Sequence, residues 1–277
     1  MKWGDLVACA VAAIFLMGWG TAHSHEFWMV PDSFQPAGDS VSLAMHVGEN
    51  FSGDLVGLST AFITQLHRRA EGRSSDLQTS IPAEPVGGVQ VPLAGSGTQL
   101  FWADTQPSHV SLDAGRFYAY LHDEGLDEII EARQKAGTSD QPGRERFRRN
   151  VKTLVNSAGP PGDAAMHVAG QRVEIVPLSD PGAKPAGSDV AFQVLWEGKP
   201  LPRALVKFWH RRGGQLVVIR VVTNAQGKLV ATPPFAGTWM ASVVHMIPAT
   251  DSAQDDWDSY WGSLTFELQG SSMAPRK

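Results

Sequence analysis

The sequence predicts a mainly β fold, with two β-sandwich regions and a short helical insertion between them. Short runs in both halves of the chain alternate apolar and polar residues, and Val41, Leu43, Met45 and Val47 show this period of a half-buried strand. Clusters of Gly, Pro, Ser and Asp separate the runs, as turns do in a sandwich. The period becomes helical only near the middle of the chain, so a parallel sheet with alternating helices is not expected.

Four segments follow one another along the chain. We expect a signal peptide over residues 1–24, an N-terminal β-sandwich region over 25–112, a helical insertion and linker over 113–165, and a C-terminal Ig-like β-sandwich over 170–270. The last region ends in a clear alternation, which places Leu264, Phe266 and Leu268 on one face of a strand.

Composition limits the classes of function. The chain has 277 residues, enough for one large domain or two smaller ones, and a net charge of −5, which argues against a nucleic-acid partner. The single cysteine, Cys9, lies in the leader, so the mature chain has neither disulfides nor thiolate ligands.

The leader resembles an export signal. Its apolar run, Leu6–Trp19, is shorter than the roughly 20 residues that span a bilayer, so we expect cleavage and a periplasmic mature chain without a membrane span. Cleavage after Ser24 leaves His25 as the first residue, and cleavage after Ala22 leaves it third. We expect the first.

Three helices are expected in the insertion. Apolar residues at helical spacing mark them: Phe117, Tyr120 and Leu121; Leu126, Ile129 and Ile130; and Phe147, Val151, Leu154 and Val155. The outer face of the third carries five basic residues: Arg144, Arg146, Arg148, Arg149 and Lys152. Such a face either binds an anion or a partner, or pairs with acidic residues of the two preceding helices, and we expect the pairing.

Several motifs stand out along the chain: His25-Glu26-Phe27-Trp28, Val47-Gly48-Glu49, Tyr120-Leu121 with Glu124-Gly125-Leu126-Asp127, Asp140-Gln141-Pro142-Gly143-Arg144-Glu145-Arg146, Val244-His245-Met246 and the stretch Trp257–Phe266. Together these motifs resemble the DUF4198 family. The resemblance implies a periplasmic component of a nickel or cobalt uptake system, with a membrane metal-uptake transporter as its partner. The C-terminal part is also similar to transthyretin-like and Cna-B-like modules, which are mostly adhesive or structural; Gly198–Leu201 and Thr223–Gly227 carry that likeness.

A metal site can also be argued from the residues. If His25 is the first residue, its amine and Nδ1 chelate one cation, and one further imidazole completes a three-nitrogen site suited to Cu, Ni or Zn. If His25 is third, the amine, backbone amides and imidazole form a square-planar site that favours Cu(II) or Ni(II). Both arrangements predict a divalent transition metal (Ni, Co, Cu or Zn), and neither identifies it.

We expect His245 to supply the further imidazole, because it lies near a strand end within a family motif, and His67 is the second choice. His210 shares a strand face with apolar residues and is expected to be packed. Glu49 stands where, as the resemblance implies, related metal-uptake proteins often carry a histidine. The acidic and aromatic stretch Asp255–Trp261 either orients an imidazole through a carboxylate, offers a platform on which a sugar stacks, or packs onto the sandwich.

Enzyme motifs are missing: the sequence has no nucleophile elbow, no His-Glu-x-x-His, no phosphate loop and no cysteine after the leader. We therefore expect no catalytic residues and no enzyme. The leading hypothesis is an exported protein that binds a transition metal for uptake or homeostasis. The alternatives are a non-catalytic β-sandwich interaction or adhesion module, and a copper-dependent oxidase that uses an amino-terminal histidine.

Overall fold

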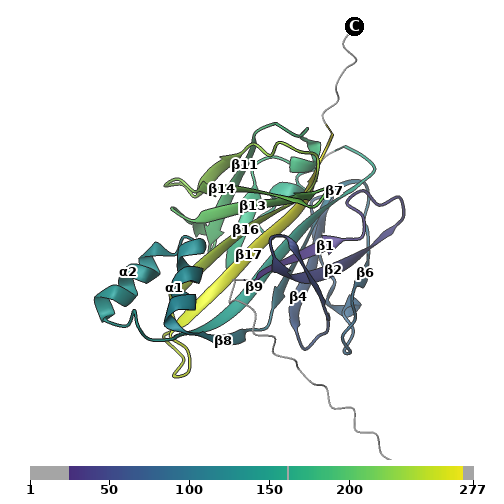
Figure 1. Cartoon of the computed structure of the whole chain (residues 1–277). Coiled ribbons are helices and arrows are strands. Elements are labelled where there is room, and N and C mark those ends of the chain that lie inside the picture. Colours follow the sequence, from purple (N-terminus) through teal and green to yellow (C-terminus); the bar gives the residue numbers. More distant parts are fainter. Residues whose placement is uncertain (1–24, 161, 271–277) are drawn as a thin grey trace, which may run out of the picture.

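The computed structural model of the chain describes residues 25–160 and 162–270. The predicted signal peptide, residues 1–24, lies outside the described residues. Within the described part, no helix is both long enough and apolar enough to cross a membrane. Strands dominate, and two α-helices follow one another in the middle of the chain (Figure 1), which confirms the predicted mainly β fold with a short helical insertion.

The largest sheet of the described residues has nine strands, and we call it the long sheet. Its order is β14-β13-β16-β17-β9-β7-β4-β5, and β8 also pairs with β9. The strand bounds are β4 (Ile63–Ala70), β5 (Arg73–Asp76), β7 (Gly97–Thr105), β8 (Ser108–Leu112), β9 (Gly143–Ser157), β13 (Leu205–Arg212), β14 (Gln215–Val222), β16 (Gly237–Pro248) and β17 (Trp257–Leu268). The pair β17–β9 is parallel, and it joins the middle of the chain to its end.

Two smaller sheets pack on the long sheet. The N-terminal sheet contains β1 (Glu26–Pro31), β2 (Ser40–Glu49), β3 (Ser52–Val56) and β6 (Val89–Pro92). The C-terminal sheet contains β10 (Val173–Pro177), β11 (Val190–Trp196), β12 (Lys199–Pro200) and β15 (Lys228–Ala231). Short 3₁₀ turns lie at Gln78–Ser80, Ala164–Met166 and Pro181–Ala183.

The smaller sheets cover opposite faces of the long sheet. Along β7, Leu100 and Trp102 belong to the apolar core under the C-terminal sheet, whereas Phe101 and Ala103 belong to the core under the N-terminal sheet. Successive side chains of a strand point to opposite faces, so the long sheet is the layer that the two sandwiches share. Figure 1 shows the N-terminal strands toward one end of this layer and the helices toward the other.

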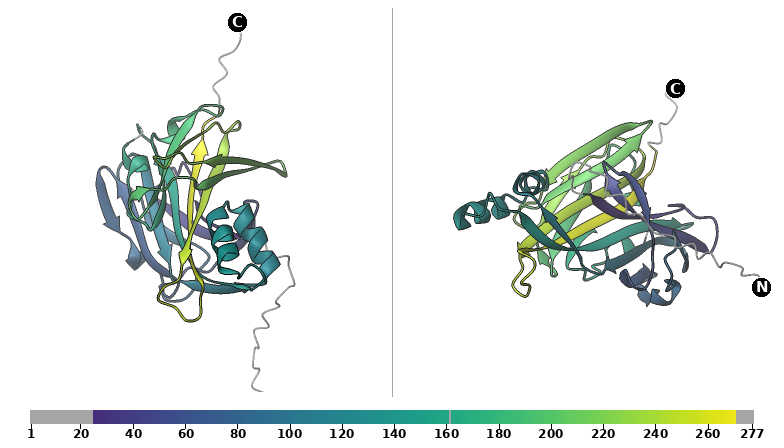
Figure 2. Two further views of the ribbon diagram at one scale, coloured as in Figure 1. Left: turned by 90° about the vertical axis from the view of Figure 1, so that its left-hand side faces the viewer. Right: turned by 60° about the horizontal axis from the view of Figure 1, so that its bottom comes forward.

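Helices α1 (Ala114–Asp123) and α2 (Asp127–Ala136) confirm the first two predicted helices. The Asp113 side chain caps α1 by accepting a hydrogen bond from the Arg116 amide, and α2 ends at Gly137, which has a left-handed conformation with φ of 66°. Both helices bury apolar side chains against Val244, Met246 and Trp257 of the long sheet. Figure 2 shows them projecting from one end of the molecule.

The third predicted helix is wrong, because residues Gly143–Ser157 form strand β9. This strand lies inside the long sheet, between β17 and β7, and both of its faces are covered. Val151 and Val155 face the N-terminal sheet, whereas Leu154 faces the C-terminal sheet. A strand that buries both faces loses the alternation of apolar and polar residues, and here the remaining pattern matched the helical spacing.

The predicted partners of the basic residues are also wrong. Arg144 and Arg146 donate to Asp256 and Asp258 from the end of the chain, with Arg146 Nε 2.6 Å from Asp258 Oδ1. Lys152 is buried and binds Glu174 of β10. These pairs form because β9 lies beside β17 and because the Lys152 ammonium reaches Glu174 and the Ile175 carbonyl of β10, an arrangement that the local sequence does not reveal.

The long sheet takes strands from all three predicted regions: β4, β5, β7 and β8 from 25–112, β9 from 113–165, and β13, β14, β16 and β17 from 170–270. The division of the mature chain into these regions stays a prediction. The shared sheet explains why the motifs quoted above can meet in space although they are far apart in sequence.

Candidate functional site

Strand β1 carries the motif His25-Glu26-Phe27-Trp28 and is hydrogen-bonded to the long sheet. One edge of β1 pairs with β2, and at the other edge the Thr265 hydroxyl of β17 donates to the Met29 carbonyl over 2.6 Å. Phe27 and Trp28 are each only 4% exposed. Because adjacent side chains of β1 are both buried, the backbone that follows His25 is held firmly in place.

Trp28 fixes one side of this strand. Its ring stacks on His46 with ring centres 5.7 Å apart and meets Phe51 edge-on at 5.3 Å. It also packs with Trp209 and Met240 of the long sheet. The motif therefore anchors the start of the described chain to two sheets at once.

His25 lies beside Glu49, at the end of β2. The distance between His25 Nε2 and Glu49 Oε1 is 3.7 Å, and the two side chains are 56% and 36% exposed. The turn after Glu49 is tight: a Cβ added to Gly48 would lie 2.2 Å from the Ser52 carbonyl oxygen. Only glycine permits this close approach of β2 and β3, so Gly48 helps to fix the position of Glu49.

The next residue, Glu26, belongs to a buried charged cluster that we define as Glu26, Asp123, Glu124 and Lys207. The Lys207 ammonium lies 2.6 Å from Asp123, 2.8 Å from Glu124 and 4.0 Å from Glu26. Glu26, Glu124 and Lys207 are each at most 4% exposed, whereas Asp123 is half-exposed and also binds Arg220. One cation thus ties β1 to the end of α1.

The cluster shifts the pKa of its members. Burial, followed by the charge of Glu124, raises the pKa of Glu26 well above its ordinary value, and Lys207 opposes the rise. Burial alone would lower the pKa of Lys207, but the neighbouring carboxylates outweigh it and the pKa of Lys207 is raised. The second oxygen of Glu26 is buried without a hydrogen-bond partner, so protonation of this carboxyl is favoured by its surroundings.

A second buried network lies on the same face of the long sheet as the charged cluster. The Tyr120 hydroxyl donates to Glu145 over 3.1 Å, the Ser259 hydroxyl donates to the same carboxylate, and Trp261 Nε1 donates to Ser259 over 3.1 Å. Burial raises the pKa of Glu145, and burial with the nearby carboxylates raises the pKa of Tyr120 well above its ordinary value. Three of the sequence motifs therefore meet in this network: Tyr120-Leu121, Asp140–Arg146 and Trp257–Phe266.

His245 lies on β16, opposite Tyr260 of β17, with its ring centre 4.4 Å from that of Trp196. It lines a cleft of about 700 Å³ between the start of α2, residues 201–205 and the end of β16. Burial lowers the pKa of His245, which favours the neutral imidazole. The side chain is therefore able to act as a ligand, and its ring packs on Trp196, whereas His25 lies beside Glu49.

His67 occupies a third environment. It lies on β4, where its ring stacks on Trp102 of β7 at 5.2 Å, and His167 approaches the same tryptophan at 5.7 Å. His210, in contrast, is buried against Trp239 and its Nδ1 lies 2.8 Å from the Thr238 carbonyl oxygen, which confirms the expectation that it is packed.

Residues 25–160 and 162–270 contain no group of three or more His, Cys, Asp or Glu side chains placed to hold a metal ion. The structure brings His25 together with Glu49, but it surrounds His245 and His67 with other residues. The acidic stretch near the end of the chain does orient an imidazole: Asp255 lies 3.0 Å from Nδ1 of His109.

Lys207 is central to the charged cluster, but it belongs to none of the motifs that the sequence singles out. One signal was available, because a lysine interrupts the apolar run Leu205–Trp209 at a position where a strand inside a sheet is buried. A fully buried lysine requires carboxylate partners. The identity of those partners, from β1 and α1, needs the fold.

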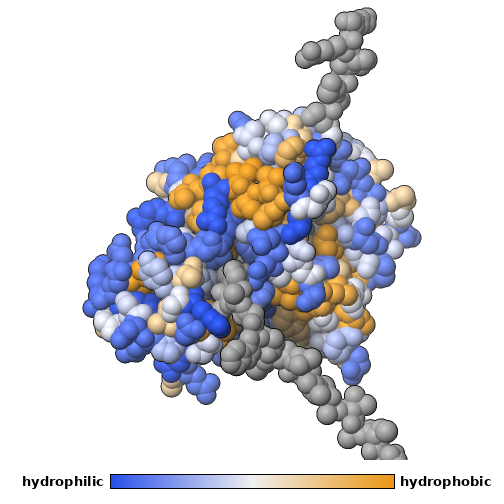
Figure 3. Space-filling view, viewed as in Figure 1, coloured by the Kyte–Doolittle hydropathy of each residue, from blue (hydrophilic) through white to orange (hydrophobic). Residues whose placement is uncertain are grey.

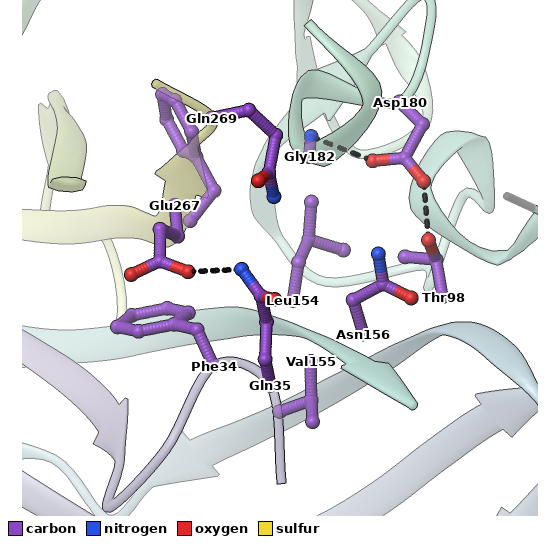
Figure 4. A pocket seen from close by; sticks show the side chains of 11 residues that line it. Phe34, Gln35, Thr98, Leu154, Val155, Asn156, Asp180, Gly182, Glu267 and Gln269 are labelled. Atoms are coloured by element: carbon purple, nitrogen blue, oxygen red, sulfur yellow. Dashed lines mark hydrogen bonds between the residues drawn. The ribbon is translucent and has the colours of Figure 1, made fainter. Parts of the chain in front are cut away.

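A second, much smaller cavity of about 20 Å³ lies between β9, β17 and residues 34–35 (Figure 4). Its polar side chains already pair with one another: Gln35 donates to Glu267 over 2.7 Å, and Asp180 accepts from Thr98 and from the Gly182 amide. A cavity of this size holds about one water molecule, so it is not a ligand site.

Known proteins outside the family resemble this chain only distantly. No curated protein matches the chain. Similar solved structures include a tetra-tandem repeat in the extending region of a large adhesion protein (10% identity, 90% of this chain and 50% of that chain, TM-score 0.23) and a marsupial T cell receptor (9%, 92% and 76%, 0.24). The dimeric latent PorU of Porphyromonas gingivalis is a third (9%, 88% and 20%, 0.20). The chain spans about half the length of the first of these, and such TM-scores support no argument about function.

A family comparison is more informative. Residues 22–247 match a family described as a domain of unknown function, DUF4198. This span begins just before His25 and includes the charged cluster and His245. The chain therefore belongs to the DUF4198 family.

Proposed function

We propose that this protein is an exported, periplasmic protein that binds a divalent transition metal through His25, as an accessory to nickel, cobalt or copper uptake or homeostasis. The observation that supports the proposal is the pairing of the His25 imidazole with Glu49 at the start of a buried strand. A mature chain cut after Ser24 would add a free amine to the same residue.

The two ring nitrogens of His25 have different surroundings. Glu49 lies at Nε2 of His25, and a carboxylate at one ring nitrogen favours a proton there and a lone pair on the other. Nδ1 is the nitrogen that can close a chelate with the α-amine of the same residue. We therefore assign Glu49 the role of orienting the imidazole, while the amine and Nδ1 bind the metal.

This donor set fits a metal that prefers nitrogen. Amine and imidazole ligands suit Cu, Ni and Zn, and copper binds most tightly in the general order of divalent metals. The amine and Nδ1 of His25 supply two ligands, so a chelate formed by this residue leaves coordination positions open. Open positions allow a partner to take over the ion, which suits a protein that delivers metal rather than stores it.

Anchoring of β1 makes the chelate rigid. Phe27, Trp28 and Glu26 are buried, and the β2–β3 turn holds Glu49 in place. A site whose supporting residues are locked by packing loses less freedom when the metal binds. The charged cluster thus contributes to binding through position, without contacting the metal.

Calorimetric titration of Cu(II), Ni(II), Co(II) and Zn(II) into the processed chain tests the proposal. We expect His25→Ala to abolish tight binding and Glu49→Gln to weaken it several-fold. His109→Ala is the matched control, because His109 is an exposed histidine that is also paired with a carboxylate, Asp255. Equal binding by the wild type and His25→Ala refutes the proposal.

The titration also separates the two earlier candidate ligands from His25. His245→Ala and His67→Ala should bind metal as the wild type does, because His245 packs on Trp196 and His67 stacks on Trp102, whereas the proposed chelate uses only His25. Loss of binding in either variant would move the metal away from the amino terminus.

A further inference from the structure

The two outer strands of the long sheet differ in a way that points to an interface. At one edge, β5 is a strand of four residues, Arg73-Ser74-Ser75-Asp76, and all of them are polar. At the other edge, β14 has eight residues, of which six are Leu, Val or Ile. Natural sheets protect their edges with short strands, charges, prolines or bulges, so β5 is protected and β14 is not.

The features of β14 leave its edge open. Its ladder with β13 runs without a shift from Leu205↔Val222 to Arg212↔Gln215, so no bulge turns it away. Its one charged side chain, Arg220, forms an ion pair with Asp123 over 2.6 Å. A strand of this length and composition is a template for another strand.

The outer edge of β14 pairs with no other strand among the described residues. All eight of its residues are at least partly exposed, with Leu216 at 38% and Val222 at 57%. Figure 3 shows apolar side chains gathered on the face of the molecule over β13 and β14. Unpaired backbone groups and exposed apolar side chains thus occur on the same strand.

We propose that two copies of this chain form a dimer by pairing their β14 strands antiparallel, about a two-fold axis through Ile219. In this register Leu216 of one copy lies opposite Val222 of the other, and Val217 lies opposite Val221. Val218 lies opposite Arg220, so no two charges of equal sign are directly opposed.

A second copy is favoured as the partner because the strand is complementary to itself. In a two-fold interface each residue contacts a residue of the same strand in the other copy. The residues on both sides of Ile219 in β14 are mostly apolar, so the strand can pair with itself. The single exception, Arg220, meets valine and keeps its bond to Asp123. The long sheet then continues across both copies and removes its only long unprotected edge among the described strands. This inference does not depend on metal binding.

Sedimentation velocity of the processed chain over a wide dilution series tests the dimer. We expect a reversible monomer–dimer equilibrium, in which the β14 amides gain hydrogen-exchange protection as the concentration rises. The double variant Leu216→Lys/Val222→Lys opposes lysines twice across the interface and should weaken the dimer by about tenfold or more. Val168→Lys, at a comparably exposed valine that follows the Ala164–Met166 turn, should not.

A charge-swap mixture tests the register. The variant Leu216→Glu/Val222→Glu should also be monomeric alone, and mixing it with the lysine variant should restore a dimer, because residues 216 and 222 face each other. Thermal melting of each monomer confirms that both variants fold. A wild-type chain that stays monomeric at all concentrations overturns the proposal, as does a dimer with unchanged affinity in the lysine variant. A lysine–glutamate mixture that stays monomeric overturns the register.

Discussion

Replacing Lys207 with methionine tests how strand β1, which carries the motif His25-Glu26-Phe27-Trp28, is anchored. The side chain of Lys207 is 1% exposed, and its ammonium is shared by Glu26, Glu124 and Asp123. Methionine keeps most of the volume of the side chain but removes the charge. Asp123 retains Arg220 and is half-exposed, so the cost falls on Glu26 and Glu124, which lose the cation while they are buried. Removing one partner of a buried charge pair costs about 3–5 kcal/mol, and we expect a loss in that range at neutral pH.

The loss should depend on pH. The pKa of Glu26 is already raised by burial and by Glu124, and removal of Lys207 takes away the main charge that lowers it. A carboxyl whose pKa is raised on folding contributes stability below its ordinary pKa, and this contribution is lost as the pH rises. The variant should therefore approach the stability of the wild type toward acidic pH and fall further behind it toward neutral pH.

Urea denaturation followed by circular dichroism at several pH values measures this effect. Lys135→Met is the matched control. Lys135 is also paired with a carboxylate, Glu131 at 3.4 Å, but it is 79% exposed. Its loss should therefore change the free energy of unfolding by less than about 0.5 kcal/mol. A cost for Lys207→Met below about 1 kcal/mol at neutral pH, or one that does not vary with pH, would refute the account of the charged cluster.

Three further outcomes are expected. Trp28→Ala should cost about 3–5 kcal/mol in urea denaturation, because the side chain is 4% exposed between two sheets. Burial lowers the pKa of His245, so the wild type should lose stability as the pH falls below about 6.5, and His245→Gln should lose less over the same interval. Gly48→Ala should cost about 1–3 kcal/mol and weaken metal binding, because the new Cβ would push Ser52 away and displace Glu49; Gly38→Ala, which has open space around it, should do neither.

Much of the fold could be predicted from periodicity. The alternation at Val41–Val47 marks β2, and the helical spacing of Phe117, Tyr120 and Leu121 marks α1. Both elements bury one face, so the sequence itself carries their period. The fold class follows from such elements.

The failure at β9 has a physical cause. Lys152 and Arg146 read as a solvated helix face, yet each charge binds a carboxylate from another part of the chain. Both faces of β9 mix polar and apolar residues: Lys152 neighbours Leu154 on one face, and Thr153 lies between the valines of the other, so the strand has no simple period of two. Asp258 is 112 positions away from Arg146 along the sequence, and its place beside β9 follows only from the parallel pairing with β17.

The candidate site was predictable in part. The motif at His25 was identified from its position after the leader, and Glu49 from its family motif. The pairing of the two depends on the β1–β2 register, in which Glu26 lies opposite Gly48. The neighbours of His245 and His67 could not be predicted in the same way, because strand parity gives the face of a residue but not its partners.

The most direct test of the metal proposal compares two forms of one chain in a Cu(II) titration. The first is a processed chain whose first residue is shown by mass spectrometry to be His25, and the second is the same chain with its amino group acetylated. Acetylation removes the amine and leaves the imidazole and Glu49 in place. The chelate predicts that acetylation weakens copper binding by at least about tenfold, since one of two nitrogen ligands is lost. Equal affinity in the two forms would contradict it and place the metal elsewhere.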